Sequence, residues 1–212
     1  LGLNGAWRRR MTNLLRLSAC LFVLLSFNVK ALVVNGCTIE AYTSCSNSDL
    51  SGAYLNSVDL LNAELINTNF HYADLSGAVL WGANLTNANL SFSVLSGANL
   101  SDANLNHSDL TAADLYYTDL SGANLSGANL NAAEMTMANF SYADLTHADL
   151  SFAITYSTDF LNATYNNFTI FDTDFDPIAA GMINISEVPL PAGIYLFLSG
   201  LVGLGLMRGR NV

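Results

Sequence analysis

Three short stretches show the pattern that decides the fold: Ala73–Gly77 (ADLSG), Ala83–Asn87 (ANLTN) and Ala98–Asp102 (ANLSD). The pattern A-(D/N)-L-x-x continues without interruption from about Asp49 to Phe175. Of the 26 positions found at every fifth residue from 50 to 175, 24 are large and apolar, and 18 of these are Leu. Two residues earlier in each unit, 17 of 26 positions are Ala. Each unit therefore pairs one large apolar side chain with one small one.

A repeat of five residues matches neither the helix period of 3.6 nor the strand period of 2. A helix would spread the leucines around its circumference, and a strand would send alternate leucines to opposite faces. We therefore predict a square coil in which each pentapeptide forms one side and four units, or 20 residues, complete a turn. The Leu and Ala sites then point to the axis. The Ala must be small because four large side chains already fill each layer.

This register resembles that of the pentapeptide-repeat proteins. The resemblance implies an all-β fold, a right-handed quadrilateral β-helix, over residues 48–176. Each coil of such a solenoid supplies backbone partners for the next. After Thr155 the repeat becomes richer in aromatic residues, which predicts a cap over the open end. In similar proteins an aromatic end can form a dimer face, so the resemblance also makes a homodimer a candidate assembly.

The charges are segregated along the chain. It has 212 residues with 17 Asp or Glu, 7 Lys or Arg, and a net charge of −10. All the acidic residues lie between Ala31 and Met207, where there is no Lys or Arg. We expect no direct binding to nucleic acid, because phosphate groups need cations that this segment lacks.

Residues 1–31 have the features of an export signal, which predicts a signal helix before the solenoid. A basic residue precedes an apolar run at 17–29, and residues 29–31 resemble a small-x-Ala cleavage site. Residues 1–10 precede Met11 and are interpreted as lying upstream of the true start. The alternative is an anchor that stays in the membrane.

Residues 32–47 are interpreted as an N-terminal cap that contains Cys37 and Cys45. In an oxidising compartment, two cysteines this close in sequence predict a disulfide. The alternative is two buried free thiols. No Cys/His group has the spacing of a zinc site, so we expect no metal, and nothing indicates a cofactor.

A short linker at 177–187 leads to a C-terminal segment, 188–212, with three parts. These are a motif, an apolar stretch and a basic end: Val188, Pro189, Leu190, Pro191 and Ala192; Ile194–Met207; and Arg208 and Arg210. From Leu190 the apolar run reaches about the minimum length of a transmembrane helix. The basic end favours a cytoplasmic position for the tail.

This tripartite tail resembles the VPLPA class of PEP-CTERM sorting signals of Gram-negative bacteria. The resemblance implies export, transient or lasting anchoring in the membrane, recognition of Val188–Ala192 by an exosortase-type sorting protease, and delivery to the outer surface. The alternative is an ordinary C-terminal anchor.

The outward residues of the repeat carry whatever binding chemistry it has. Residues 20 apart should stack, which predicts an amide ladder of Asn84, Asn104 and Asn124. Asp114 and Glu134 fall one coil apart, so their face should prefer counter-ions or a cationic partner. Tyr72 and Phe92 should be neighbours in a binding stripe for a sugar or a protein. Further outward aromatic residues are Tyr116, Tyr117, Tyr142, Phe152 and Tyr156.

The function that these features favour is that of an exported, non-enzymatic surface protein. It would be a rigid acidic scaffold for protein or glycan interaction. We expect no catalytic residues, because the carboxylates repeat on a convex surface and acid–base catalysis needs two groups in distinct environments. The alternative is a DNA mimic that binds DNA gyrase, as some similar proteins do. The export features contradict this alternative, because gyrase is cytoplasmic.

Overall fold

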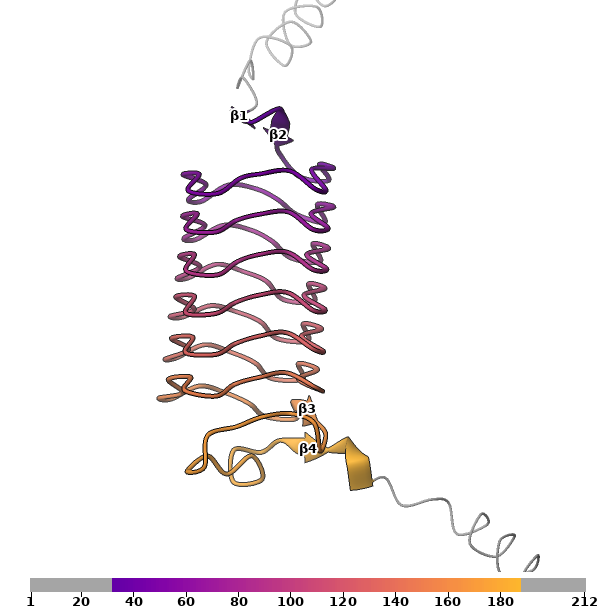
Figure 1. The fold of residues 1–212 in the computed structure, drawn as a ribbon, viewed down its shortest axis with the longest axis vertical. Helices are drawn as coiled ribbons and strands as arrows, with labels where there is room; N and C mark the ends of the chain where they lie inside the picture. The colour runs from indigo at the N-terminus through magenta and orange to yellow at the C-terminus, as the bar shows by residue number, and fades with distance from the viewer. Residues whose placement is uncertain (1–31, 188–212) are drawn as a thin grey trace, which may run out of the picture. The chain divides into compact units, whose positions relative to one another are not determined.

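The computed structural model describes residues 32–187, which wind into a β-helix (Figure 1). Parallel β-bridges join residues 20 positions apart, from Ser44↔Glu64 to Asp144↔Thr164. Four pentapeptides therefore complete one turn, as the five-residue period predicts. The predicted export signal, sorting motif and membrane tail lie outside the described residues. Within residues 32–187, no helix is long and apolar enough to cross a membrane.

Each pentapeptide ends in a β-turn whose third residue has a left-handed backbone. In one unit, the N–H of Ala83 donates to the C=O of Leu80 at 3.0 Å, and Gly82 between them has a φ of 64°. Glycine adopts this conformation without steric cost. The equivalent position of other units holds Tyr72 and Phe92, each with a φ of 58°. For a residue with a side chain, this conformation costs roughly 1–2 kcal/mol.

Backbone hydrogen bonds between coils follow the 20-residue step. The N–H of Leu85 donates to the C=O of Asn104 at 2.7 Å, and the N–H of Asn104 donates to the C=O of Ala83 at 2.9 Å. The same pattern recurs along the coil. A buried backbone group without a partner costs about as much as a lost hydrogen bond, so each coil depends on its neighbours. The ladder thus joins the coils into one continuous stack.

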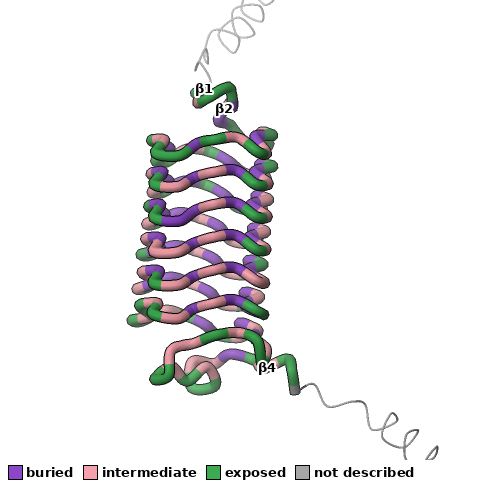
Figure 2. Tube along the Cα trace, viewed as in Figure 1, coloured by how far each residue is buried: buried purple, intermediate pink, exposed green. Residues whose placement is uncertain are grey.

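Leu and Ala side chains at the inward positions fill the axis of the coil. Figure 2 marks the buried residues, which recur regularly along every coil. Every fifth residue from Leu50 to Leu150 is buried, as predicted. At several Ala positions that hold Ser or Thr, the hydroxyl finds a backbone acceptor, but the buried Ser108 Oγ has no hydrogen-bond partner among the described residues. Thr68 Oγ1, for example, donates to the C=O of Cys45 at 3.0 Å, and Ser93 Oγ donates within its own turn. The interior therefore tolerates these hydroxyl groups.

The predicted register is wrong beyond Tyr165. Asp149 bridges Ile170, a step of 21 residues instead of 20, because one extra residue stands between Tyr165 and the next turn. As a result Ile170, which the five-residue period places inward, is 52% exposed. Phe168 at the adjacent small-residue site is also exposed. The repeat therefore does not run uninterrupted to Phe175.

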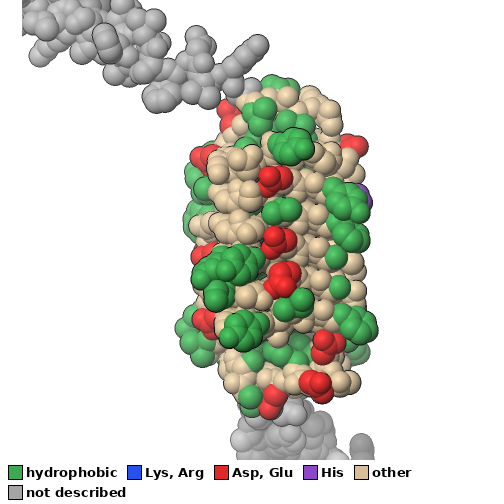
Figure 3. Space-filling view, turned by 90° about the vertical axis from the view of Figure 1, so that its left-hand side faces the viewer, with side chains coloured by type: hydrophobic (Ala, Val, Ile, Leu, Met, Phe, Trp, Pro, Cys, Tyr) green, Lys and Arg blue, Asp and Glu red, His purple; other side chains and the backbone are tan. Residues whose placement is uncertain are grey.

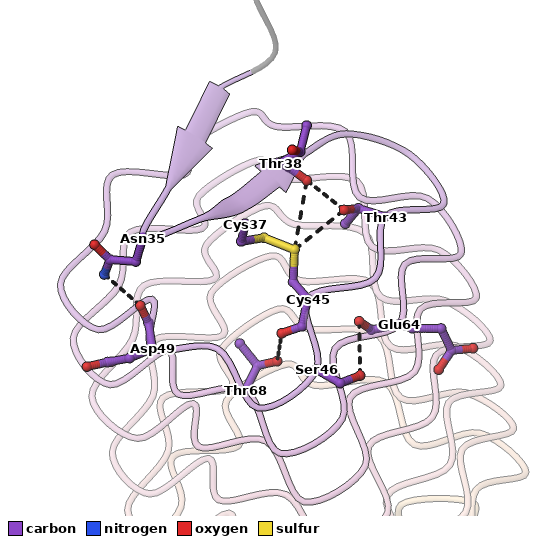
Figure 4. Close-up of a disulfide and its surroundings, with 9 residues drawn as sticks. All are labelled: Asn35, Cys37, Thr38, Thr43, Cys45, Ser46, Asp49, Glu64 and Thr68. Atoms are coloured by element: carbon purple, nitrogen blue, oxygen red, sulfur yellow. Dashed lines mark hydrogen bonds between the residues drawn. A yellow bond between two sulfur atoms is a disulfide. The ribbon is translucent and has the colours of Figure 1, made fainter.

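The N-terminal cap contains two short strands and a disulfide (Figure 4). Strand β1 (Leu32–Val34) and strand β2 (Cys37–Ile39) form a two-stranded sheet. Cys37 is disulfide-bonded to Cys45 with a Cα–Cα distance of 5.5 Å, and both are buried against the first core layer. By the loop-entropy argument, closing this short loop stabilises the fold by about 2–3 kcal/mol.

The C-terminal cap replaces the last coil by a shorter connection. Strand β3 (Thr164–Tyr165) pairs in parallel with strand β4 (Ile183–Asn184), which is followed by the 3-10 helix η1 (Ile185–Glu187). The rings of Phe171 and Phe175 stack at a centroid distance of 5.1 Å and pack against the core. These residues cover the end of the core, as the aromatic enrichment predicts.

Candidate interaction surface

Because the coil repeats every 20 residues, its outward side chains form columns. Parallel bridges join the successive members of one column, which are Tyr54, Asp74, Val94, Asp114, Glu134 and Ile154. The turn corners on its two sides carry exposed aromatic and Met side chains: Tyr72, Phe92 and Phe152 on one corner, and Tyr116, Tyr117, Met137 and Tyr156 on the other. We call this column and its two corners the acidic–aromatic face.

Exposed large hydrophobic side chains gather on this face. Fifteen such side chains lie between residues 42 and 162, and ten of them belong to the acidic–aromatic face. None belongs to the opposite column, whose members include Glu64, Asn84 and Asn104. Figure 3 views a side of the coil on which acidic side chains form a row between two groups of hydrophobic ones. Exposed apolar clusters are typical of interaction surfaces, so this face is the candidate surface.

The first corner contains the predicted binding stripe. The rings of Tyr72 and Phe92 lie 5.2 Å apart and are inclined by 32°. Tyr72 is 63% exposed and Phe92 is 45% exposed. The ring of His71 packs 4.2 Å from that of Tyr72, and its Nδ1 lies 2.8 Å from Ser91 Oγ, which holds the cluster in place. The two stripe residues are thus exposed neighbours, and their binding role stays a prediction.

The second corner extends the apolar surface to the other side of the column. Tyr116 and Tyr117 form an edge-to-face pair at a centroid distance of 4.6 Å. Met137 follows Tyr117 one coil later and is exposed. The outward position of the two Tyr residues was predicted, but their place on one face with Tyr72 was not, and neither was the exposure of Met137. The 20-residue step is the sequence signal that predicts these positions, because it places Met137 one coil after Tyr117.

Each of the three carboxylates in the column uses one oxygen for a local hydrogen bond. The hydroxyl of Ser76 donates to Asp74 Oδ1 at 2.7 Å, and its N–H donates at 3.0 Å. The Ser76 hydroxyl, and then its N–H, hold the pKa of Asp74 below the usual value. Asp114 Oδ1 and Glu134 Oε1 each accept from the N–H two residues later. Within residues 32–187, the second oxygen of each group accepts no hydrogen bond.

The opposite column, called here the amide column, contains Glu64, Asn84, Asn104, Asn124 and Asp144. Asn84 Nδ2 donates to Glu64 Oε2 at 2.9 Å, and Asn104 Nδ2 donates to Asn84 Oδ1 at 3.4 Å. The predicted ladder stops there: within residues 32–187, Asn124 Nδ2 donates to no neighbouring side chain, and Asn124 Oδ1 accepts only the N–H of Ser126. In the acidic–aromatic column of the described coils, no side chain bonds to the coil above or below.

Two other kinds of site can be assessed within residues 32–187, a metal cluster and a pocket. Among the described residues, no group of three His, Cys, Asp or Glu could hold a metal ion. A pocket of about 190 Å³ lies at the C-terminal end, lined by Leu150, Ala153, Thr155, Phe171, Asp172, Asp174 and Phe175. It contains two carboxylates but no His or Cys beside them. The sorting-motif residues Val188–Ala192 and the tail Ile194–Arg210 lie outside the described residues.

Comparison with known proteins places the chain in a family. Segments 43–82, 73–111, 83–122 and 113–151 match the family model described as pentapeptide repeats, in eight copies. Together they cover half of the sequence. The protein therefore belongs to the pentapeptide-repeat family. No curated protein sequence matches the chain.

Solved structures of the same kind resemble the described coil. HetL of the cyanobacterium Nostoc sp. strain PCC 7120, a pentapeptide repeat protein involved in heterocyst differentiation regulation, is 31% identical, with 68% of this chain and 70% of HetL covered and a TM-score of 0.50. Rfr23 of the cyanobacterium Cyanothece 51142 is 26% identical over 61% of this chain and 84% of its own, with a TM-score of 0.27. QnrB1, a plasmid-mediated fluoroquinolone resistance protein, is 21% identical over 63% and 73%, with a TM-score of 0.42.

Proposed function

We propose that the protein is an exported, non-enzymatic scaffold that binds a protein or glycan ligand at the cell envelope through the acidic–aromatic face. The observation that carries this proposal is the clustering of ten exposed large hydrophobic side chains around three carboxylates. Aromatic and Met side chains are enriched in interfaces between proteins. A patch rimmed by polar groups is typical of a binding site.

The coil suits a scaffold because its surface is formed before any ligand arrives. Every coil pairs its backbone with its neighbours, and the outward columns follow from that pairing. A preformed surface loses less conformational entropy on binding than a flexible one. The face can therefore bind without rearrangement of the coil.

Both ends of the sequence and the cap support export. Residues 1–31 have the pattern of a signal peptide, and Val188–Ala192 with the apolar run Ile194–Met207 have the pattern of a sorting signal. The Cys37–Cys45 disulfide suits an oxidising compartment outside the cytoplasm. An exosortase-type protease is the partner that this tail would have, and the membrane would hold the tail before or after sorting.

Fractionation of cells tests the proposal. The full chain would be expressed in a Gram-negative host that has a sorting protease of this class, and in the same host without it. We expect the protein to become accessible to an externally added protease only when the sorting protease is present. Replacing Pro189 and Pro191 by Ala should abolish this accessibility, whereas Ile185→Ala in the preceding linker should not. Full-length protein in the cytosol of both strains would contradict the proposal.

A supercoiling assay separates this proposal from gyrase binding. The acidic segment without Lys or Arg between Ala31 and Met207 is the feature that a DNA mimic would share. An exported scaffold predicts no effect of the purified protein on DNA gyrase at micromolar concentration. Inhibition, together with a cytosolic location, would replace the proposed function by DNA mimicry.

A further inference from the structure

The acidic–aromatic face lacks a counter-charge of its own. Asp114 and Glu134 are bridge partners on adjacent coils, about 4.8 Å apart in the strand-stacking direction. Like charges that face each other on neighbouring strands destabilise a sheet. No Lys or Arg occurs between Ala31 and Met207, so this segment cannot neutralise them. The second oxygen of each carboxylate also stays available to a donor from outside the coil.

The flanking corners favour an organic cation over a bare ion. Exposed aromatic rings stand on both sides of the carboxylates, with Tyr72 and Phe92 on one corner and Tyr116 and Tyr117 on the other. An Arg or Lys side chain gains from a ring within about 6 Å, and its apolar stem packs on the same surface. A metal ion would use the carboxylates alone and leave the apolar corners exposed.

Charge excludes several other occupants of this face. A second copy, docked face to face, would bring Asp74, Asp114 and Glu134 against the same carboxylates. Nucleic acid and anionic lipid would be repelled for the same reason. A neutral glycan could stack on the rings but would leave the carboxylates without a cation.

We propose that the acidic–aromatic face docks a polypeptide segment that presents Arg or Lys to the Asp74–Glu134 column and apolar side chains to the two corners. This inference rests on the proposed scaffold function and names the chemistry of its ligand. The column supplies specificity through charge complementarity. The aromatic and Met corners supply the buried apolar contacts that dominate binding free energy.

Peptide binding to matched variants of the full chain tests the inference. The probe is a fluorescent synthetic peptide in which Arg alternates with Leu, and its reference is the same peptide with citrulline in place of Arg. The first variant combines Asp74→Asn, Asp114→Asn and Glu134→Gln. The control variant makes the same change in net charge on other sides of the coil: Asp109→Asn, Asp119→Asn and Asp149→Asn. Asn is native at equivalent sites such as Asn99, so both variants should fold.

We expect Kd to rise by about tenfold in the first variant and by less than about threefold in the control, because nearby charges act more strongly than distant, screened ones. The citrulline peptide should bind much more weakly. A second pair of variants tests the corners. Tyr72→Ser with Phe92→Ser should weaken binding, whereas Tyr42→Ser with Tyr142→Ser on another corner should not.

Four results would overturn the inference: no binding of the Arg peptide, equal losses in the two charge variants, equal binding of the citrulline peptide, or binding of a neutral or amino-sugar oligosaccharide without the peptide. The last result would assign the face to a glycan. The test uses purified protein, so its failure is distinct from that of the proposed function. A protein that is exported but does not bind the peptide keeps the scaffold role. A cytosolic protein that binds the peptide loses it.

Discussion

The amide column and the acidic–aromatic face lie on opposite sides of one coil and share one backbone. In the amide column, Asn84 bonds to Glu64 and Asn104 bonds to Asn84, so these side chains are satisfied within the protein. On the acidic–aromatic face, Asp114 and Glu134 bond only to the turn that follows each of them. The first side stabilises the stack of coils, whereas the second leaves its polar groups available to a partner.

The difference shows that inward and outward side chains have separate roles in this repeat. The inward ones form the core, and the outward ones determine what each face can bind. Inward Leu and Ala are nearly the same behind every face, so the fold places few demands on the outward residues. One column can then hold amides that bond along the rod, and another can hold carboxylates beside exposed rings. The aromatic residues at Tyr72 and Phe92 even accept a left-handed backbone that Gly adopts elsewhere in the repeat.

The largest expected effect concerns the core shared by the two faces. Leu105 follows the amide-column residue Asn104, and Leu115 follows Asp114; both are fully buried. Leu105→Ala and Leu115→Ala should each lower the free energy of unfolding by about 3–5 kcal/mol. Urea denaturation would measure both. A difference of more than about 1.5 kcal/mol between them would show that the core also distinguishes the faces.

Ala substitutions at outward residues should change stability less, and by different amounts in the two columns. Asn104→Ala removes bonds to Asn84 Oδ1 and to Thr86 Oγ1, and should cost about 1 kcal/mol. Asp114→Ala removes one turn hydrogen bond but also relieves repulsion from Glu134, so the net change should be near zero. Denaturation midpoints at neutral pH would compare the two. An equal loss of stability in the two variants would contradict the proposed difference between the two columns.

Charge exchange sharpens the contrast further. Asp114→Asn with Glu134→Gln should raise the free energy of unfolding by about 0.5 kcal/mol at low salt, because like charges on adjacent coils are removed. Asn84→Asp with Asn104→Asp should lower it by a similar amount. Both differences should shrink as salt screens the charges. The expectation fails if the two variants shift stability in the same direction.

The smallest expected effect is a pH dependence at Asp74. Because the Ser76 hydroxyl and N–H lower the pKa of Asp74, the folded state is favoured above the unfolded pKa of about 3.9. This contribution is lost as pH falls through the folded pKa. Asp74→Asn should therefore cost a few tenths of a kcal/mol at pH 7, because Asp74 is only partly buried and solvent weakens the effect, and it should cost nothing at strongly acidic pH. The equivalent turn in the amide column, Asn84 with Thr86, is the non-titrating reference.

Urea unfolding of the wild type and of Asp74→Asn, repeated from pH 7 downwards, would measure their free energies of unfolding. The wild-type and variant curves should converge below about pH 4. A gap that widens in acid would contradict the sign of the effect.

Periodicity alone predicted most of the fold. The five-residue repeat places Leu50 to Leu150 inward because no other regular structure brings those positions to one axis. The extra residue after Tyr165 was not predictable, because Ile170 keeps an apolar residue at the expected position and no Gly or Pro marks the change. In the cap, β4 provides the backbone partners of β3. This pairing depends on tertiary contacts and not on the repeat.

The candidate surface was predictable in part. The step of 20 residues predicted that Tyr72 and Phe92 would be neighbours and that Asp114 would face Glu134. Together with the order of residues within a coil, the same step also places Tyr117 and Met137 on the corner that follows Asp114 and Glu134, so this part of the face could have been predicted although it was not. The step could not show which carboxylate oxygens are free of hydrogen bonds, because this depends on side-chain rotamers.

The uniform 20-residue step has a consequence for insertions and deletions. Loss of a whole coil would shorten the rod by about 4.8 Å and leave every later side chain on its original side. Loss of a single pentapeptide would preserve the core equally well but turn all later residues by a quarter of a revolution. Such a deletion would divide the acidic–aromatic face between two sides without removing any of the remaining contacts at the axis. The acidic–aromatic face would thus survive the loss of a whole 20-residue coil but not the loss of a single five-residue repeat.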